Sequence, residues 1–259
     1  MTNAQRIHAA CRWAGWHLGL SFLVILACAF LVFGVWYPSP YDQMLGIWRV
    51  MALLAMVDVV CGPVLTLVLY DPSKQRWKWA VDVTLITAIQ LSAIAYGMGL
   101  MQGNRPVFLA LEGDRFRLIQ RDHLPETDLI DKSGPFALGW SAPKPIGVRL
   151  LRAGDPGYLE SIEQAAAGVH PAFRPERWVP YSHQAAIARQ SMKPLADLRL
   201  RAGPDGLIAL DRMLNDKRLK ENEVGYLPLV SDVPVDWSVL INKGDGQPVG
   251  IVAISGWSS

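Results

Sequence analysis

Residues 16–37 read WHLGLSFLVILACAFLVFGVWY and hold no acidic or basic side chain apart from His17. A helix of about 20 apolar residues crosses the hydrocarbon core of a bilayer, so this stretch predicts a transmembrane helix. A cleaved signal peptide would have a shorter apolar core followed by small residues. Here the apolar run continues into Trp36 and Tyr37, and such aromatic residues are enriched at membrane interfaces. The chain is therefore predicted to be an integral membrane protein.

Two more apolar segments follow the first. Residues 46–70 are apolar apart from Arg49 and Asp58, and residues 79–101 contain only Asp82 and Gln90 as strongly polar exceptions. The linker DPSKQRWK separates them. We expect an N-terminal tail over residues 1–15 and a three-helix transmembrane domain over 16–102, with spans at about 16–37, 46–70 and 79–101. A soluble domain would occupy residues 103–259.

The short loops carry positive charge on one side only. Arg6 and Arg12 precede the first span, and Lys74, Arg76 and Lys78 lie between the second and third. Short loops rich in Lys and Arg stay in the cytoplasm. Three crossings then place the soluble domain outside it. The sequence predicts a multi-pass protein of a bacterial inner membrane, with a cytoplasmic N-terminus and a periplasmic C-terminal domain.

The overall composition excludes several classes of partner and site. The net charge is only +2, so no strong positive field indicates nucleic-acid binding. The three cysteines, Cys11, Cys28 and Cys61, all lie in or beside the apolar half. The soluble half therefore has no disulfide framework and no paired-cysteine metal site.

The soluble half shows strand and helix patterns in turn. Residues 107–120 alternate apolar and polar residues around Gly113-Asp114, which predicts a β-hairpin. The C-terminal runs 224–231 and 237–255 predict further strands, with a turn at Gly244–Gly246. Between these ends, we expect a strand at 146–152, followed by a helix capped by Asp155 with Pro156 at its first position. An irregular segment at 169–181 and helices at 182–190 and 204–216 should follow. The prediction is a soluble α+β domain whose sheet uses both ends of the segment.

Asp58 is the most informative residue of the apolar half. A charged residue at the centre of a span costs roughly 2.5–3.5 kcal/mol on insertion scales, so such residues usually have a role. One interpretation is a polar contact to a partner helix, an ion or a proton path. The other is a carboxyl group hydrogen-bonded within the bundle, to Thr84, Thr87 or Gln90. Gly62-Pro63 follows one turn later, and proline there removes a backbone hydrogen bond and bends the helix.

The remaining candidate positions have simpler explanations. Asp71-Pro72 ends the second span, and Asp82 lies near Lys78 at the start of the third, where a local ion pair would account for it. The five histidines show no metal-ligand spacing, and the chain has no phosphate-binding loop or nucleophile elbow. We expect no catalytic, cofactor-binding or metal site. Asp58, Gly62, Pro63, Asp71, Pro72 and Asp82 remain as candidate structural or partner-contact residues.

Several strings together resemble the TfpX/TfpZ (FimB-like) family of type IV pilin accessory proteins. These strings are LVFGVWYPSPY at 31–41, DVVCGPVLTLVLYDPSK at 58–74, IQLSAIAYG at 89–97, RPVFLALEGDRFRLI at 105–119, and the C-terminal YLPLV and GDGQPVGIVAI. The resemblance implies a non-enzymatic inner-membrane chaperone or assembly factor that promotes the stability, assembly or surface display of a cognate type IV pilin. Its partners would be the major pilin, the pilus assembly platform and membrane lipid. Cys61 and the final GWSS depart from the family pattern, which leaves the partner pilin open.

The resemblance also implies a mechanism, although other functions stay open. The three-helix bundle would offer a lateral groove, shaped by Asp58 and Gly62-Pro63, to the apolar helix of a pilin, while the outer domain contacts the pilin head. The main alternative is an inner-membrane immunity or sensor protein with a periplasmic recognition domain. A transporter subunit would need more polar residues along its spans, and a membrane-anchored enzyme would need a convergent cluster in the soluble half.

Overall fold

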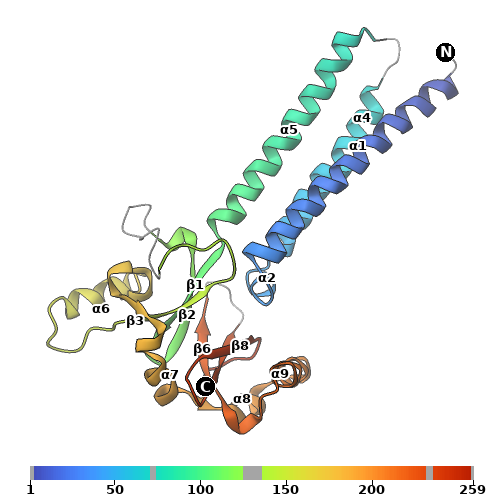
Figure 1. Ribbon diagram of the computed structural model, residues 1–259. Coiled ribbons are helices and arrows are strands. Elements are labelled where there is room, and N and C mark those ends of the chain that lie inside the picture. The colour runs from blue at the N-terminus through green and yellow to red at the C-terminus, as the bar shows by residue number, and fades with distance from the viewer. Residues whose placement is uncertain (1–2, 71–73, 125–135, 232–235, 258–259) are drawn as a thin grey trace. The chain divides into compact units, whose positions relative to one another are not determined.

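A computed structural model describes residues 3–70, 74–124, 136–231 and 236–257. The chain divides into two compact units, Met1–Asn104 and Arg105–Ser259, and each is described by itself. The first consists of long apolar helices and the second contains a sheet with helices (Figure 1). The predicted fold class, a transmembrane helix bundle followed by an α+β domain, is confirmed.

The first unit contains three helical rods. They are built from α1 (Asn3–Leu31) with a π-helical turn (Val32–Trp36), a short α2 (Tyr41–Met44), α3 (Ile47–Met56), a second π-helical turn (Val57–Cys61), α4 (Gly62–Leu69) and α5 (Arg76–Gly103). Among the described residues, three stretches are long and apolar enough to cross a membrane: Ile7–Trp36, Ile47–Leu69 and Arg76–Gly103.

One end of this bundle has a packed core. The C-terminal part of α1, the start of α3 and the end of α5 meet there around Val32, Tyr37, Met51 and Met101. The buried Tyr37 hydroxyl donates a hydrogen bond to the Met101 carbonyl oxygen, 2.6 Å away, and so ties the end of the first rod to the end of the third. This core and its hydrogen bond join the three rods at the end where α5 leads into the second unit.

The second unit is built on one mixed sheet. Its strands are β1 (Pro106–Glu112), β2 (Arg115–Gln120), β3 (Lys144–Val148), β4 (Trp178–Pro180), β5 (Lys193–Pro194), β6 (Val224–Val230), β7 (Trp237–Asn242) and β8 (Pro248–Val252). In the described residues the order is β4-β3-β1-β2-β6-β7-β8, with β5 paired to β6. The β1–β2 hairpin turns at Gly113, whose φ of +70° favours glycine. Because β2 lies beside β6, both ends of the segment share one sheet, as the sequence predicts.

Helices pack against two parts of this sheet. They are α6 (Tyr158–Ala166), α7 (Ala185–Ser191), α8 (Leu195–Arg201) and α9 (Pro204–Lys217), with 3-10 turns at Arg121–His123, Pro171–Phe173, Pro175–Arg177, Tyr181–His183 and Glu221–Glu223. One hydrophobic cluster gathers around Phe108 and Trp178, on β1 and β4. Another joins α8 and α9 to β6 around Leu198, Leu210 and Tyr226.

Three details of the sequence prediction for this unit are wrong. The segment 169–181, predicted to be irregular, contains β4, which pairs with β3. The strand predicted at 146–152 ends at Val148. The next helix begins at Tyr158, so Asp155 does not cap it; its carboxylate instead accepts a hydrogen bond from the Arg152 backbone N–H, 2.8 Å away. Gly154 and Gly157 both have positive φ, and the turn they form delays the helix start.

Candidate functional site

The second transmembrane rod changes its helical form around Asp58. Pro63 has no N–H, so the Val59 carbonyl cannot receive its normal helical hydrogen bond. The chain responds with the π-helical turn Val57–Cys61, and turns of this kind often occur at functional sites. The Thr66 hydroxyl oxygen lies 3.0 Å from the Gly62 carbonyl oxygen, within donating distance. A side-chain hydroxyl thus lies beside the backbone carbonyl that precedes Pro63.

Gln90 of α5 supplies the donor on the other side of this turn. Its Nε2 donates to the Asp58 backbone oxygen at 3.0 Å and to the Asp58 carboxylate Oδ1 at 2.7 Å. Gly62 makes the approach possible, because a Cβ at that position would lie only 2.1 Å from Gln90 Nε2. The glycine therefore sets the distance between the second rod and α5.

The Asp58 carboxylate is only half satisfied by this contact. The residue is 4% exposed and Gln90 is 7% exposed, so both are buried. Among the described residues, Oδ2 of Asp58 has no hydrogen-bond partner. The interpretation of Asp58 as a carboxyl group bonded within the bundle is correct for Oδ1, with Gln90 as the partner. The second oxygen remains an unused acceptor.

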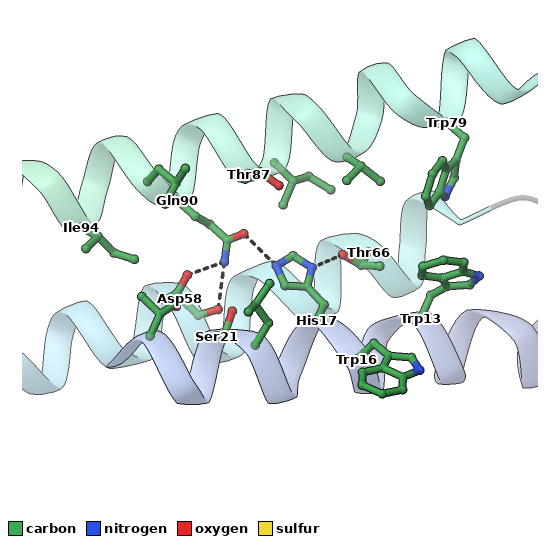
Figure 2. A pocket seen from close by; sticks show the side chains of 15 residues that line it. Trp13, Trp16, His17, Ser21, Asp58, Thr66, Trp79, Thr87, Gln90 and Ile94 are labelled. Carbon is green, nitrogen blue, oxygen red and sulfur yellow. Dashed lines mark hydrogen bonds between the residues drawn. The ribbon is translucent and has the colours of Figure 1, made fainter. Parts of the chain in front are cut away.

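His17 of α1 extends the cluster to the first helix. Its Nε2 lies 2.9 Å from Gln90 Oε1, and its Nδ1 lies 2.6 Å from Thr66 Oγ1 (Figure 2). Both amide hydrogens of Gln90 go to Asp58, so Oε1 is an acceptor and His17 Nε2 must carry a proton. The single Thr66 hydroxyl hydrogen serves either Gly62 or His17 Nδ1.

These four side chains lie at the floor of an open groove between α1 and α5. The groove has a volume of about 490 Å³. Its walls are mostly apolar and include Trp16, Leu20, Val24, Val83, Ile86 and Leu91. Figure 2 shows Trp13 and Trp79 at one end and Ile94 at the other. The indole rings of Trp13 and Trp79 contact each other edge to face, 5.3 Å between centroids.

The groove and the packed core occupy different parts of the bundle. The core gathers at the C-terminal ends of α1 and α5, whereas the groove is lined by the middle of α1, from Trp13 to Val24, and the first two-thirds of α5. Asp58 lies midway along the rod Ile47–Leu69, near the boundary between the two. α1 and α5 are therefore packed together at one end, and the groove lies between that core and the Trp13–Trp79 contact.

The other candidate positions from the sequence lie outside this site. Asp82 does not line the groove and pairs with Lys74, with 2.7 Å between Oδ2 and Nζ. The sequence favours Lys78 as its neighbour, but the Lys78 amine lies over the ring of Trp77 instead. Asp71 and Pro72 lie outside the described residues.

Sequence reasoning missed His17 as part of the cluster. The available signal was its position within an apolar span, because ionisable residues inside a membrane usually face the bundle interior. The missing information was the rotation of each helix, which sets whether His17, Asp58 and Gln90 face one another.

The second unit offers less for chemistry. In the part of the chain that the structure describes, no three His, Cys, Asp or Glu side chains lie close enough together to hold a metal ion. Glu112 and Arg117 form a buried ion pair at 2.9 Å within the β1–β2 hairpin. Burial, and secondarily the negative charge of Asp245, raises the pKa of Tyr181, whose hydroxyl donates to the Gly246 carbonyl oxygen at 2.6 Å. These contacts join strands and turns within the unit.

Comparison with known proteins places this architecture in a family. The model of the family described as fimbrial assembly protein FimB matches residues 5–46. The fimbrial assembly protein of serogroup E1 from Dichelobacter nodosus is 35% identical over 246 residues, which cover 93% of this chain and 94% of the relative. The chain belongs to the FimB family of fimbrial assembly proteins. The resemblance found in the sequence is thereby confirmed.

Other relatives support the FimB assignment over different lengths. The serogroup I protein of the same organism is 33% identical over 250 residues and is matched along 94% of its length. The protein of serogroups C1 and C2 is 39% identical over 129 residues, which are 48% of this chain and 98% of that relative. No solved structure matches the chain. The segment matched by the FimB family model contains the α1 wall of the groove, including His17 and Leu20.

Proposed function

We propose that this FimB-family protein is a non-enzymatic accessory protein of the bacterial inner membrane that promotes the stability, assembly or surface display of a cognate type IV pilin. The observation that carries the proposal is the similarity, along nearly the whole chain, to proteins named for fimbrial assembly. The groove with mostly apolar walls supports a binding role.

The proposed orientation follows from charge. Arg6, Arg12, Lys74, Arg76 and Lys78 lie at the same end of the three spans, the end that should face the cytoplasm. The second unit then lies in the periplasm. In that orientation the groove opens toward the cytoplasmic half of the bilayer, and the packed end of the bundle faces the periplasm.

The proposed mechanism uses both units. A pilin before assembly would span the same membrane with one apolar helix and keep its head in the periplasm. The groove between α1 and α5 offers an apolar surface to such a helix, and the second unit would contact the head. Holding an unassembled pilin at both levels would protect it and present it to the assembly platform.

Deleting the gene in its native host tests the function. We expect surface pili to fall while the pilin is still synthesised, and the wild-type gene to restore them. Complementation with Asp58→Asn, and with a chain truncated after Asn104, shows which unit is needed. Asp82→Asn is the matched control, because it removes a carboxylate from a span outside the groove. Unchanged pilin level, surface pili and twitching motility would refute the proposed function.

Reporter fusions test the orientation separately. Alkaline phosphatase fused after Ser259 should be active, because it folds only after export, and a fluorescent protein that folds only in the cytoplasm should be dark there. The same two reporters fused in the segment before Arg76 should behave in the opposite way. A cytoplasmic C-terminus would contradict the proposed orientation.

A further inference from the structure

The unused oxygen of Asp58 is the least satisfied polar feature of the groove. Oδ1 is held by Gln90 Nε2 at 2.7 Å, while Oδ2 has no partner in the described residues and is buried. A carboxylate without donors in a medium of low polarity is unfavourable, and membrane-embedded acids normally pair with a basic or donor group. The described lining residues include no Lys or Arg, and His17 bonds Gln90 and Thr66. The lining also carries hydroxyl groups, on Ser21, Thr66 and Thr87, but none of them bonds Oδ2.

Oδ2 is therefore an acceptor that this chain leaves unpaired among its described residues and that a second protein could use. We propose that the groove binds a partner transmembrane helix through one N–H or O–H donor, which that helix places against Oδ2 of Asp58. This inference rests on the proposed function, since it gives the chemical feature by which the pilin helix is recognised. The occupant is an apolar helix, because the walls on either side of Asp58 are apolar and open to the side of the bundle.

The polar cluster holds Asp58 ready for this contact. Gln90 fixes the carboxylate from one side, and His17 and Thr66 fix Gln90 from the other. Both amide hydrogens of Gln90 are used, so Gln90 cannot turn to satisfy Oδ2 without giving up a bond. Asp58 also lies midway along its span, which sets the depth at which the partner's donor must lie.

Gln90 makes Asp58→Asn a sharp probe. With Gln90 donating to Oδ1, the asparagine must keep its carbonyl oxygen there and place its NH₂ where Oδ2 was. The substitution preserves shape and replaces an acceptor by a donor at the proposed contact. An asparagine turned the other way would lose the Gln90 bond, so neither orientation restores the wild-type site.

Photo-crosslinking in the native membrane tests the proposal on the full chain. A photoreactive amino acid replaces Leu20 or Leu91, which line the groove, or Phe22 or Ile89, which are exposed on the same helices two residues away and do not line it. We expect an adduct with the pilin, identified by antibody and mass spectrometry, from Leu20 and Leu91 and not from the other two. Adducts of equal yield at all four positions, or adducts with a second copy of this chain, would overturn the groove as the binding site.

The same crosslinking assay tests the contact between Asp58 and the donor of the partner helix. Asp58→Asn should lower the adduct yield from Leu20 by at least about tenfold, the loss expected for one charge-assisted hydrogen bond, while Asp82→Asn leaves it unchanged. Immunoblots of the variant protein confirm equal abundance. If Asp58→Asn is not made at normal level, Leu91→Trp fills the groove with Asp58 intact and should abolish the Leu20 adduct. An adduct yield unaffected by Asp58→Asn overturns the donor contact.

The partner side completes the test. Mass spectrometry locates the crosslinked stretch of the pilin helix, and the donor residue nearest to it is replaced by an apolar residue of similar size. That variant should lose adduct as Asp58→Asn does, and combining the two should cause no further loss. Independent, multiplying losses would contradict direct contact. If deletion of the gene lowers surface pili but no groove adduct forms, the groove proposal fails and the proposed function stands.

Discussion

Replacing Gly62 by alanine should break the polar cluster without altering a charged group. The new Cβ would lie 2.1 Å from Gln90 Nε2 and 2.8 Å from its Cδ, so the Gln90 side chain must move away. Two hydrogen bonds to Asp58 and one to His17 would be lost. Such interhelical bonds contribute about 0.6 kcal/mol each, and a buried polar group left unpaired costs about 1–3 kcal/mol. We expect the free energy of unfolding to fall by about 2–4 kcal/mol.

Unfolding of the purified full chain in mild detergent, by titration with sodium dodecyl sulfate, measures this change. Gly99→Ala is the matched control, since its Cβ would meet nothing within 4 Å, and it should leave stability unchanged or slightly higher. In a Gln90→Ala background the clash disappears, so Gly62→Ala should then cost less than about 0.5 kcal/mol. An equal loss with and without the Gln90 side chain would refute the reasoning.

Three further predictions concern other parts of the chain. Gly246 has a φ of +74°, and a Cβ there would lie 2.3 Å from the Ala185 oxygen, whereas Gly157 has a similar φ of +77° in open space. Thermal unfolding should therefore show Gly246→Ala to be more destabilising than Gly157→Ala by about 1–3 kcal/mol. Equal effects of the two substitutions would contradict the clash. Burial raises the pKa of Tyr181, so the folded state keeps that proton more tightly than the unfolded state. The stabilisation that protonated Tyr181 gives the fold is complete below about pH 10 and is lost as the pH rises further. The unfolding midpoint should therefore decline less steeply between pH 8 and 11 in Tyr181→Phe than in the wild-type protein. Identical slopes would contradict the raised pKa of Tyr181. Asp82→Asn removes a partly exposed pair with Lys74 and should change the free energy of unfolding by less than about 1 kcal/mol, which a loss above about 2 kcal/mol would disprove.

The sequence predicts the apolar helices well because only their length and composition matter. An uninterrupted run such as residues 16–37 satisfies its own backbone hydrogen bonds in any rotation, so its existence needs no knowledge of neighbours. The β1–β2 hairpin is equally local, because Gly113 alone permits the turn. Both predictions need only the residues of one continuous segment, and so the sequence alone was enough for them.

The polar cluster depends on information that an apolar helix does not display. His17 and Gln90 are 73 positions apart, and each lies in a helix that is apolar on every side, so no hydrophobic stripe shows which face turns inward. Gln90 was one of three residues that the sequence offered to Asp58. The close approach that selects it depends on Gly62, whose missing side chain carries no pattern of its own.

The ion pair of Asp82 was not predictable from residue spacing alone. Lys78 stands four residues before Asp82, which favours an ion pair on one helix face. In the structure Asp82 forms an ion pair with Lys74, and the Lys78 amine lies over the ring of Trp77. A lysine outside the helix can approach a carboxylate without holding a helical rotamer, and an indole ring at the membrane edge is a competing site for the ammonium group.

The groove between α1 and α5 also has a consequence for lipid. When no partner helix is present, acyl chains must fill the space between α1 and α5, since the bilayer leaves no vacuum beside a protein. An acyl chain packs well against Leu20 or Leu91 but has no donor for Asp58. Partner binding is therefore an exchange, in which a helix displaces lipid of nearly equal apolar affinity. Most of the preference for the helix then comes from one polar contact and from release of ordered acyl chains, so bilayer composition should tune how readily the protein takes up and hands over its partner.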